Sequence, residues 1–255
     1  MMQAMIFAAG LGTRLKPLTD TMPKALVNVG GQTLLQRTIK KLEEAGVGRI
    51  VINVHHFSEQ IENYLKANDN FGLDIAVSDE SAGLLETGGG IKKARSLFST
   101  EGNILIHNVD ILSNVDLRKF YAQHTQCDAL LLVSKRTTKR YFLFDDEMRL
   151  VGWTNVETGE VKSPHPHLDP ARCQMYAFSG IHSFSPSLFD AMDTFPERFG
   201  IVDFYLQMCS RYDIRGVVKD DLKLLDVGKL DTLERLPEPQ AGHSHLSDEE
   251  ILMSL

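Results

Sequence analysis

The chain has 255 residues, of which 43% are hydrophobic and 24% charged, and its formal net charge is −7. This composition is typical of a globular protein and excludes a disordered or fibrous chain. An acidic surface disfavours nucleic acid as a partner. The apolar runs are far shorter than the roughly 18 residues that a membrane span needs, so we expect no membrane segment.

The first half of the chain alternates short apolar runs with helical patterns, as βαβ units on a parallel sheet do. The expected helices are 33–45, which ends at Gly46, one that begins with Ser58 as its N-cap, 90–98 and about 116–124. The expected strands are 5–9, 49–54, 73–77, 103–107 and 128–134.

The rhythm changes after about residue 135. We expect an antiparallel hairpin with strands 141–144 and 149–153, because an acidic turn separates two apolar runs. Prolines predict a loop at 163–170. The remaining expected elements are a strand at 174–183, helices from Ser185 and at 202–212, and a hairpin around 220–221.

These patterns predict one α/β domain over residues 1–236, with a mostly parallel mixed sheet and an inserted antiparallel hairpin region. Residues 237–255 are predicted to form a linker and a short C-terminal helical tail. The tail helix is expected to open with a capping box at Ser247 and Glu250 and to be peripheral.

Residues 8–24 are the most informative segment, because they follow the first predicted strand, where open α/β sheets bind ligands. Gly10 and Gly12 allow a tight turn that presents backbone N–H groups to an anion. Three basic residues here outnumber one acidic residue, which indicates a polyphosphate ligand. The dinucleotide fingerprint is excluded because Leu15 replaces its third glycine, and no Walker Gly-Lys-Ser/Thr occurs.

The combination of Gly-x-Gly-Thr-Arg at residues 10–14 with Pro-Lys at 23–24 resembles the signature of the sugar-phosphate nucleotidylyltransferases. Four further segments are similar to motifs of that family and follow its order. They are Leu-Glu-Thr-Gly-Gly-Gly-Ile at 85–91, Asn-Val-Asp at 108–110, Gly-Ile-His at 180–182 and Asp-Val-Gly at 226–228. The resemblance includes N-acetylmuramate-1-phosphate uridylyltransferases and bacterial mannose-1-phosphate guanylyltransferases.

The resemblance implies a three-layer Rossmann-like nucleotidyltransferase fold and a Mg²⁺-dependent enzyme. Such an enzyme couples a nucleoside triphosphate to a sugar 1-phosphate and releases pyrophosphate. Because the reaction joins two anions, neutralisation and alignment of charge dominate catalysis. Aspartate oxygens suit Mg²⁺, the planar fork of arginine suits the leaving pyrophosphate, and the compact charge of lysine suits the α-phosphate or the sugar phosphate.

Carried over residue by residue, the resemblance makes Arg14 and Lys24 the catalytic residues, both expected to be exposed, and Asp110 and Asp226 the metal ligands. The predicted nucleotide-binding residues are Ala9, Gly10, Gly12, Thr13, Ser78, Gly83, Glu86, Thr87 and Gly88. The predicted sugar-binding residues are Asn108, Gly180 and Ile181.

One departure concerns the sugar. Many relatives carry Glu-Lys-Pro after the central hairpin, with a lysine on the sugar phosphate, whereas this chain reads Trp-Thr-Asn at 153–155. Lys162 or Arg172 are the alternatives for that contact. The Leu-Glu-Thr-Gly-Gly-Gly run is most similar to that of enzymes that use UTP, so the resemblance favours UTP over GTP. The small residues there leave room for a base to approach the backbone, and a guanine would also fit, so neither the base nor the sugar is settled by the sequence.

Two other functions stay open at this point. One is a cytidylyltransferase acting on phosphocholine or another alcohol phosphate, and the other is a non-catalytic protein that binds nucleotide-sugars. We expect a monomer or small homo-oligomer. The three separated cysteines and an N-terminus without a basic region predict a cytoplasmic protein with no signal peptide.

Overall fold

The computed structural model describes residues 1–237, 239 and 245–254. The chain divides into two compact units, which we call unit 1 and unit 2. Unit 1 contains Met1–Leu84, His107–Arg118 and Leu222–Leu255, and unit 2 contains Leu85–Ile106 and Lys119–Asp221. Within the described residues, no helix is both long and apolar enough to cross a membrane.

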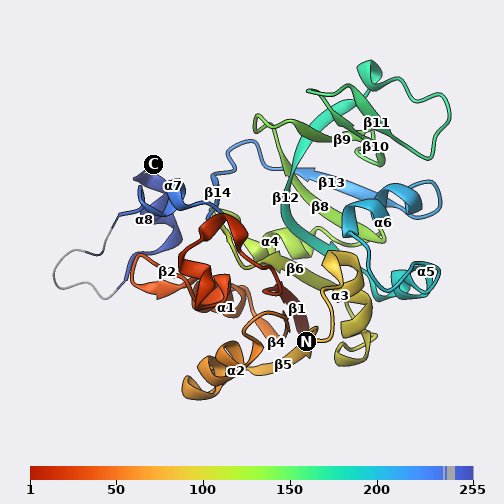
Figure 1. The fold of residues 1–255 in the computed structure, drawn as a ribbon. Coiled ribbons are helices and arrows are strands. Elements are labelled where there is room, and N and C mark those ends of the chain that lie inside the picture. The colour runs from red at the N-terminus through yellow and green to blue at the C-terminus, as the bar shows by residue number, and fades with distance from the viewer. Residues whose placement is uncertain (238, 240–244, 255) are drawn as a thin grey trace. The chain divides into compact units, whose positions relative to one another are not determined.

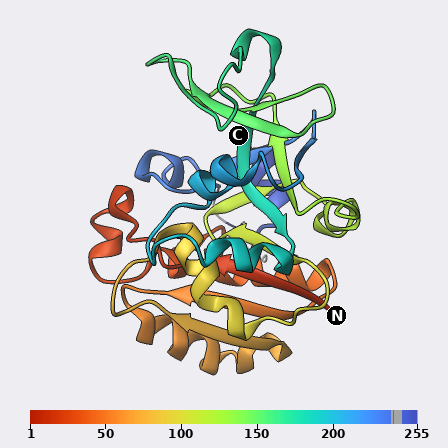
Figure 2. The same cartoon turned by 90° about the vertical axis from the view of Figure 1, so that its right-hand side faces the viewer.

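A three-stranded parallel ladder forms the centre of unit 1. Its central strand β4 (Val47–Val54) pairs with β1 (Met2–Phe7) on one side and with β5 (Asp74–Asp79) on the other. Most of β4 is buried, and its sequence is almost continuously apolar, as expected for a parallel strand that is covered on both faces. Figures 1 and 2 show this part of the chain in red to orange, with α1 (Leu34–Glu44) and α2 (Ser58–Ala67) beside the strands.

The two helices of unit 1 begin differently from one another. Thr33 caps α1, because its side chain accepts the N–H of Gln36, and the helix is followed by Gly46 at φ +92° as predicted. The prediction that Ser58 caps α2 is wrong. Phe57, at φ +57°, precedes the helix and Ser58 is its first residue.

Two short ladders complete unit 1, and sequence patterns predicted neither. β2 (Asn28–Val29) pairs with β3 (Gln32–Thr33), and β7 (Ile111–Ser113) pairs antiparallel with β14 (Leu224–Asp226). The hairpin predicted around residues 220–221 is therefore wrong, because β14 pairs with β7 and not with the strand that precedes it in the chain.

Unit 2 is built around β12 (Gln174–Phe184), which pairs antiparallel with β8 (Ala129–Ser134) and β9 (Arg140–Phe144). β9 forms the predicted hairpin with β10 (Leu150–Asn155). The other strands are β11 (Glu160–Lys162), antiparallel to β10, and β13 (Ile214–Val218), parallel to β8. The mixed sheet and the inserted antiparallel strands confirm the predicted α/β class.

The helices of unit 2 are α3 (Glu86–Ala94), α5 (Phe189–Met192) and α6 (Ile201–Met208), while β6 (Ile104–Asn108) and α4 (Leu117–Ala122) cross the unit boundaries. Helix α3 begins four residues before its predicted start. Glycines permit this, since a Cβ on Gly88 would lie 2.4 Å from the ring of Phe199. Short 3₁₀ helices occupy Thr13–Leu15, Leu18–Asp20, Lys24–Leu26, Asp69–Gly72, Arg95–Leu97, Pro170–Arg172 and Pro186–Leu188.

The C-terminal helices are α7 (Leu230–Leu233) and α8 (Asp248–Met253). The predicted capping box at Ser247 and Glu250 is confirmed. The expectation of a peripheral tail is wrong, because Ile251 is fully buried and Leu252 is nearly so. Most of the predicted linker from residue 237, namely 238 and 240–244, lies outside the described residues.

Candidate active site

The predicted phosphate-binding loop is fixed at the ends of the parallel strands of unit 1. The Ala8 N–H donates to Asn53 Oδ1 at 2.8 Å, and Asn53 Nδ2 donates to Glu80 Oε1 at 2.8 Å. Asn53 and Glu80 are almost completely buried, so this chain ties the start of the loop to the ends of β4 and β5. Sequence analysis missed both residues. The one available indication was the polar side chain of Asn53 within the otherwise apolar end of β4.

Gly12 turns the loop back on itself. Its φ is +62°, which favours glycine, and its carbonyl accepts the Leu15 N–H and the Thr19 hydroxyl, both at 2.8 Å. A Cβ at this position would lie 2.8 Å from Thr19 Cγ2 and 3.1 Å from Lys24 Cβ. The turn therefore packs the first half of the loop directly against the residue predicted to carry catalytic charge.

The two predicted metal ligands lie at the β7–β14 ladder, because Asp110 immediately precedes β7 and Asp226 is the last residue of β14. In the β7–β14 ladder Asp226 stands opposite Ile111, and the Val227 N–H donates to the Asp110 carbonyl at 2.9 Å. The neighbouring Val109 N–H donates to the Phe7 carbonyl at 3.2 Å, which places this segment beside the end of β1. Asp110 and Asp226 thus come together although all of β8 to β13 lies between them in the chain.

Each carboxylate faces one of the predicted catalytic cations. Lys24 Nζ donates to Asp110 Oδ2, and these side chains are 10% and 19% exposed. Arg14 Nη2 lies 3.9 Å from Asp226 Oδ2, and both of these side chains are about half exposed. The prediction of an exposed Arg14 is confirmed. The same prediction for Lys24 is wrong, because pairing with Asp110 allows the ammonium group to be buried.

Gly228 leaves room for the second pair. A Cβ there would lie 2.5 Å from Asp226 Oδ1 and 2.7 Å from Arg14 Nη2. The carboxylate and the guanidinium therefore approach the Gly228 backbone more closely than a larger residue would allow. Among the described residues, no group of three histidine, cysteine or acidic side chains forms a metal site. Two aspartates alone nevertheless fit Mg²⁺, which prefers oxygen ligands and usually takes the remainder of its shell from water and substrate phosphates.

Three of the predicted nucleotide-binding residues lie at the start of α3 in unit 2, where they contact the segment before α6. Glu86 pairs with Arg198 at 2.9 Å, and the Thr87 hydroxyl accepts the Ile201 N–H at 2.9 Å. The Gly88 N–H donates to the Phe199 carbonyl at 2.9 Å. These contacts give all three a structural role inside unit 2.

The other predicted binding residues are divided between the units. Ser78 is buried at the end of β5, Gly83 donates its N–H to the Glu80 carbonyl at 2.9 Å, and Asn108 ends β6. In unit 2, Gly180 has φ +80° within β12 and the side chain of Ile181 is fully buried. In the loop itself, Ala9 is buried and Thr13 begins a 3₁₀ helix. A Cβ added to Gly10 would have open space within 4 Å.

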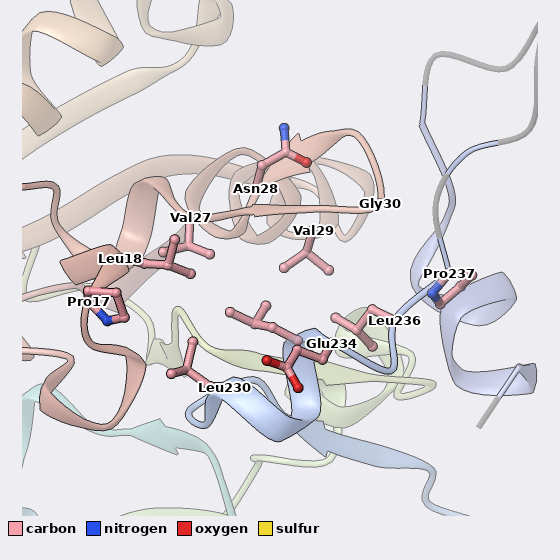
Figure 3. A pocket seen from close by; sticks show the side chains of 11 residues that line it. Pro17, Leu18, Val27, Asn28, Val29, Gly30, Leu230, Glu234, Leu236 and Pro237 are labelled. Atoms are coloured by element: carbon pink, nitrogen blue, oxygen red, sulfur yellow. The ribbon is translucent and has the colours of Figure 1, made fainter.

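Unit 1 also contains an apolar hollow of about 450 Å³ that the sequence did not predict. Figure 3 shows its side chains converging from the segment at 17–30 and from α7 and the residues after it. Asn28 and Glu234 are its polar members. The lining residues are Pro17, Leu18, Val27, Asn28, Val29, Gly30, Leu230, Leu233, Glu234, Leu236 and Pro237.

Comparison with known proteins gives consistent results. The chain is 47% identical over 109 residues to an N-acetylmuramate alpha-1-phosphate uridylyltransferase of Caulobacter vibrioides, a match that covers 42% of this chain and 45% of that protein. The protein of the same name from Neisseria meningitidis is 44% identical over 115 residues, which is 45% of this chain and 49% of the relative. The chain thus matches about half the length of these curated relatives.

A solved structure described as a putative glucose-1-phosphate thymidylyltransferase from Bacillus anthracis shares the fold, with a TM-score of 0.76 at 16% identity over 92% of this chain and 93% of that one. The model of the family described as "Nucleotidyl transferase" matches residues 3–238, which include the glycine loop, both aspartates and both cations. By this match over nearly the whole chain, the protein belongs to the nucleotidyl transferase family.

Proposed function

We propose that this chain is a sugar-1-phosphate nucleotidylyltransferase that uses Mg²⁺ and prefers UTP. Its products are a nucleotide-sugar and pyrophosphate. The observation that carries the proposal is the convergence of Arg14, Lys24, Asp110 and Asp226 beside the turn at Gly12. This arrangement supplies two cations for phosphates and two carboxylates for a hard metal ion within one unit.

The reaction needs little covalent chemistry from the protein. An oxygen of the sugar phosphate attacks the α-phosphorus, the bond from that phosphorus to the bridging oxygen breaks, and the electron pair leaves with pyrophosphate. Arg14 is exposed and can bind the leaving pyrophosphate through its planar fork. Lys24 offers a point charge to the α-phosphate or the incoming sugar phosphate.

Mg²⁺ would be held by Asp110 and Asp226 and would supply positive charge to the phosphate oxygens. Lys24 pairs with Asp110, and Arg14 lies near Asp226. Binding of a nucleotide offers these cations phosphate oxygens as new partners, which frees both carboxylates. The ion pairs of the structure therefore hold the side chains close to their working positions.

Support for UTP comes from the two relatives named above, both named as uridylyltransferases, and from the resemblance of residues 85–90 to the corresponding run of enzymes that use UTP. For the sugar phosphate, Lys162 and Arg172 are the two candidates, and Lys162 also lies 3.8 Å from Glu160 and 3.9 Å from Asp203. Lys162 stands directly opposite Trp153 in the β10–β11 ladder, and its ammonium lies 5.3 Å from the centre of the indole ring. This cation is held beside the segment that replaces the family's lysine motif.

The test is a matrix of substrates with the purified chain. Each of four nucleoside triphosphates is combined with hexose, amino-sugar and heptose 1-phosphates and with phosphocholine, and pyrophosphate release is measured with Mg²⁺ and with a chelator. We expect release with UTP and one sugar 1-phosphate, and none with the chelator. A GTP value of kcat/KM about tenfold above that of UTP would overturn the base assignment alone.

Two variants in the same loop sharpen the experiment. Arg14→Lys should lose roughly 10²-fold in kcat/KM, since a point charge does not replace a planar fork. Lys16→Ala is the matched control, because Lys16 is exposed to a similar extent and pairs only locally, with Asp20. Binding of nucleotide-sugar without any pyrophosphate release would favour a non-catalytic protein, and release with CTP and phosphocholine alone would favour a cytidylyltransferase.

A further inference from the structure

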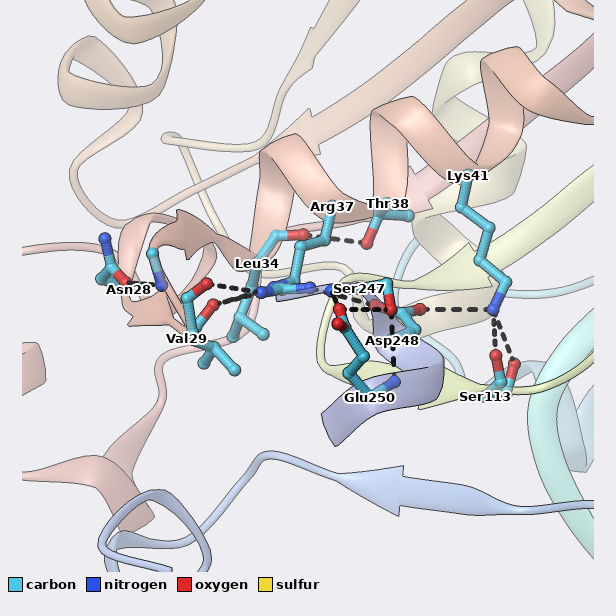
Figure 4. Close-up of polar contacts among 12 residues, drawn as sticks. Asn28, Val29, Leu34, Arg37, Thr38, Lys41, Ser113, Ser247, Asp248 and Glu250 are labelled. Carbon is cyan, nitrogen blue, oxygen red and sulfur yellow. Dashed lines mark hydrogen bonds and ion pairs between the residues drawn. The ribbon is translucent and has the colours of Figure 1, made fainter. Parts of the chain in front are cut away.

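The C-terminal helix α8 places one carboxylate against two cations of α1, one of them buried and the other largely so. Asp248 Oδ1 lies 3.3 Å from Arg37 Nη1, and Asp248 Oδ2 lies 3.3 Å from Lys41 Nζ. The side chains of Arg37, Lys41 and Asp248 are 4%, 16% and 20% exposed. Figure 4 shows Asp248 between the two cations. The tail thus contributes charge to the interior of unit 1.

The two cations are one helical turn apart and repel one another. Burial lowers the pKa of both Arg37 and Lys41, and Asp248 acts in the opposite direction on each. Arg37 also donates to the Val29 carbonyl at 2.9 and 2.6 Å. Lys41 depends more on the tail, because Asp248 provides its ion pair. Without Asp248, this largely buried ammonium would lose the carboxylate that pairs with it in the described part of the chain and would keep only the weaker influence of Glu44.

Lys41 connects this cluster to the candidate active site. Its Nζ donates to the Ser113 carbonyl and lies 3.3 Å from the Ser113 hydroxyl, at the end of β7 (Figure 4). The Thr38 hydroxyl, on the same face of α1, has the Leu34 carbonyl as its nearer acceptor at 3.0 Å and lies 3.4 Å from the Val109 carbonyl. Helix α1 therefore holds the segment 109–113 at its Ser113 end through Lys41, and Thr38 lies beside its Val109 end. That segment carries Asp110 and pairs with the strand that carries Asp226.

The tail is itself firmly docked. The Leu246 N–H donates to the Gly30 carbonyl at 2.9 Å, and Ile251 is fully buried. The capping box of Ser247 and Glu250 fixes the first turn of α8, where Asp248 lies. A helix anchored by backbone, apolar and capping contacts presents its carboxylate in one orientation, as an element that positions other groups must do.

We propose that Asp248, acting through Lys41, positions the two metal-binding aspartates. The tail carboxylate keeps Lys41 in place, Lys41 fixes the end of β7, and the β7–β14 ladder sets the distance between Asp110 and Asp226. Asp248 and Lys41 are positioning residues that touch neither metal nor substrate. The inference rests on the proposed function only in treating Asp110 and Asp226 as metal ligands.

The test combines two measurements on Asp248→Asn. Hydrogen exchange of the backbone amides of β7 and β14 should accelerate by about tenfold or more, while exchange in the centre of β4 stays unchanged. The Mg²⁺ concentration that gives half-maximal pyrophosphate release should rise about fivefold or more, with a smaller change in KM for the nucleotide. A purely structural role would accelerate exchange in all strands of unit 1 alike.

Glu249→Gln is the matched control. It removes the same charge from the same turn of α8, and Glu249 is exposed. Both readouts should remain at wild-type values. If Asp248→Asn fails to fold, the double variant Lys41→Met, Asp248→Asn replaces it, because it leaves no buried ammonium unpaired. The double variant should fold and show the same local acceleration, since the Ser113 contact is still lost.

Unchanged exchange in β7 and β14, or an unchanged Mg²⁺ requirement in an active variant, would overturn the inference. Failure of the proposed function has a different signature. In that case the wild-type chain releases no pyrophosphate with any substrate pair, whereas hydrogen exchange still shows whether Asp248 orders the ladder. The two conclusions are therefore tested separately.

Discussion

Replacing Gly228 by alanine should disable the candidate active site while leaving the fold almost unchanged. The new Cβ would lie 2.5 Å from Asp226 Oδ1 and 2.7 Å from Arg14 Nη2, whereas ordinary contact begins at 3.4 Å. The carboxylate must therefore retreat by about 0.9 Å and the guanidinium by about 0.7 Å, and a displacement of this size typically costs about 10²-fold in rate.

The cost in stability should be small. Both displaced atoms are the ends of half-exposed side chains, and Gly228 does not have the left-handed φ that would strain an alanine. We expect the free energy of unfolding, measured in urea, to change by less than about 1 kcal/mol. The activity assay is pyrophosphate release with Mg²⁺, UTP and the best sugar 1-phosphate.

Gly48→Ala is the matched control, because its Cβ would meet only the flexible side chain of Met1, at 2.7 Å. This variant should retain wild-type kcat/KM. If Gly228→Ala also retained it, then the positions of Asp226 and Arg14 would not matter for turnover, and their assigned roles would be refuted. If Gly228→Ala instead lost activity because it unfolded, the prediction that the displaced side chains can move at little cost in stability would be wrong.

Three further changes have defined outcomes. Lys24→Met should lower turnover by about 10²-fold or more. It should also lower the free energy of unfolding by about 3 kcal/mol, because it leaves Asp110 unpaired in a mostly buried position. Wild-type stability in urea would contradict this cost of leaving the carboxylate unpaired. Lys162→Met should raise KM for the sugar 1-phosphate about tenfold with little change for UTP, and equal effects on both substrates would exclude a specific contact. Burial lowers the pKa of His182 from 6.5 to about 3. Between these two pH values the imidazole is protonated in the unfolded state and neutral in the folded state. The free energy of unfolding should therefore fall by about 1.4 kcal/mol per pH unit as the pH decreases through this range. His182→Gln should reduce that slope in acid unfolding curves, and an unchanged slope would show that other groups produce it.

The turn at Gly12 was predictable because the residues that determine it are neighbours in the sequence. Gly12 adopts the left-handed φ that its place in a tight turn suggested, and the strand predicted at 5–9 is present as β1, which begins earlier, at Met2, and ends at Phe7. The same holds for Thr33 and Gly46, which bound α1 as capping chemistry requires. Where the chain's conformation depends on neighbours in sequence, the pattern was sufficient.

Long-range contacts explain what the sequence did not reveal. β7 and β14 have three residues each, too few for a periodic pattern, and each is stabilised by the other. The burial of Lys24 depends on Asp110, and the docking of α8 depends on Arg37 and Lys41. None of these partners is near in sequence, so propensity and spacing carry no signal for them.

The composition of unit 1 from three separate stretches has a consequence for biosynthesis. Asp110 and the loop at Gly12 leave the ribosome well before β14, which must be synthesised before the β7–β14 ladder can form. Unit 2, by contrast, is complete at Asp221, so its own contacts can form while Asp226 is still in the exit tunnel. The nascent chain therefore holds β7 without its partner strand throughout the synthesis of unit 2. Asp110 and Asp226 come together only after β14 has been synthesised, when a long loop has to be closed.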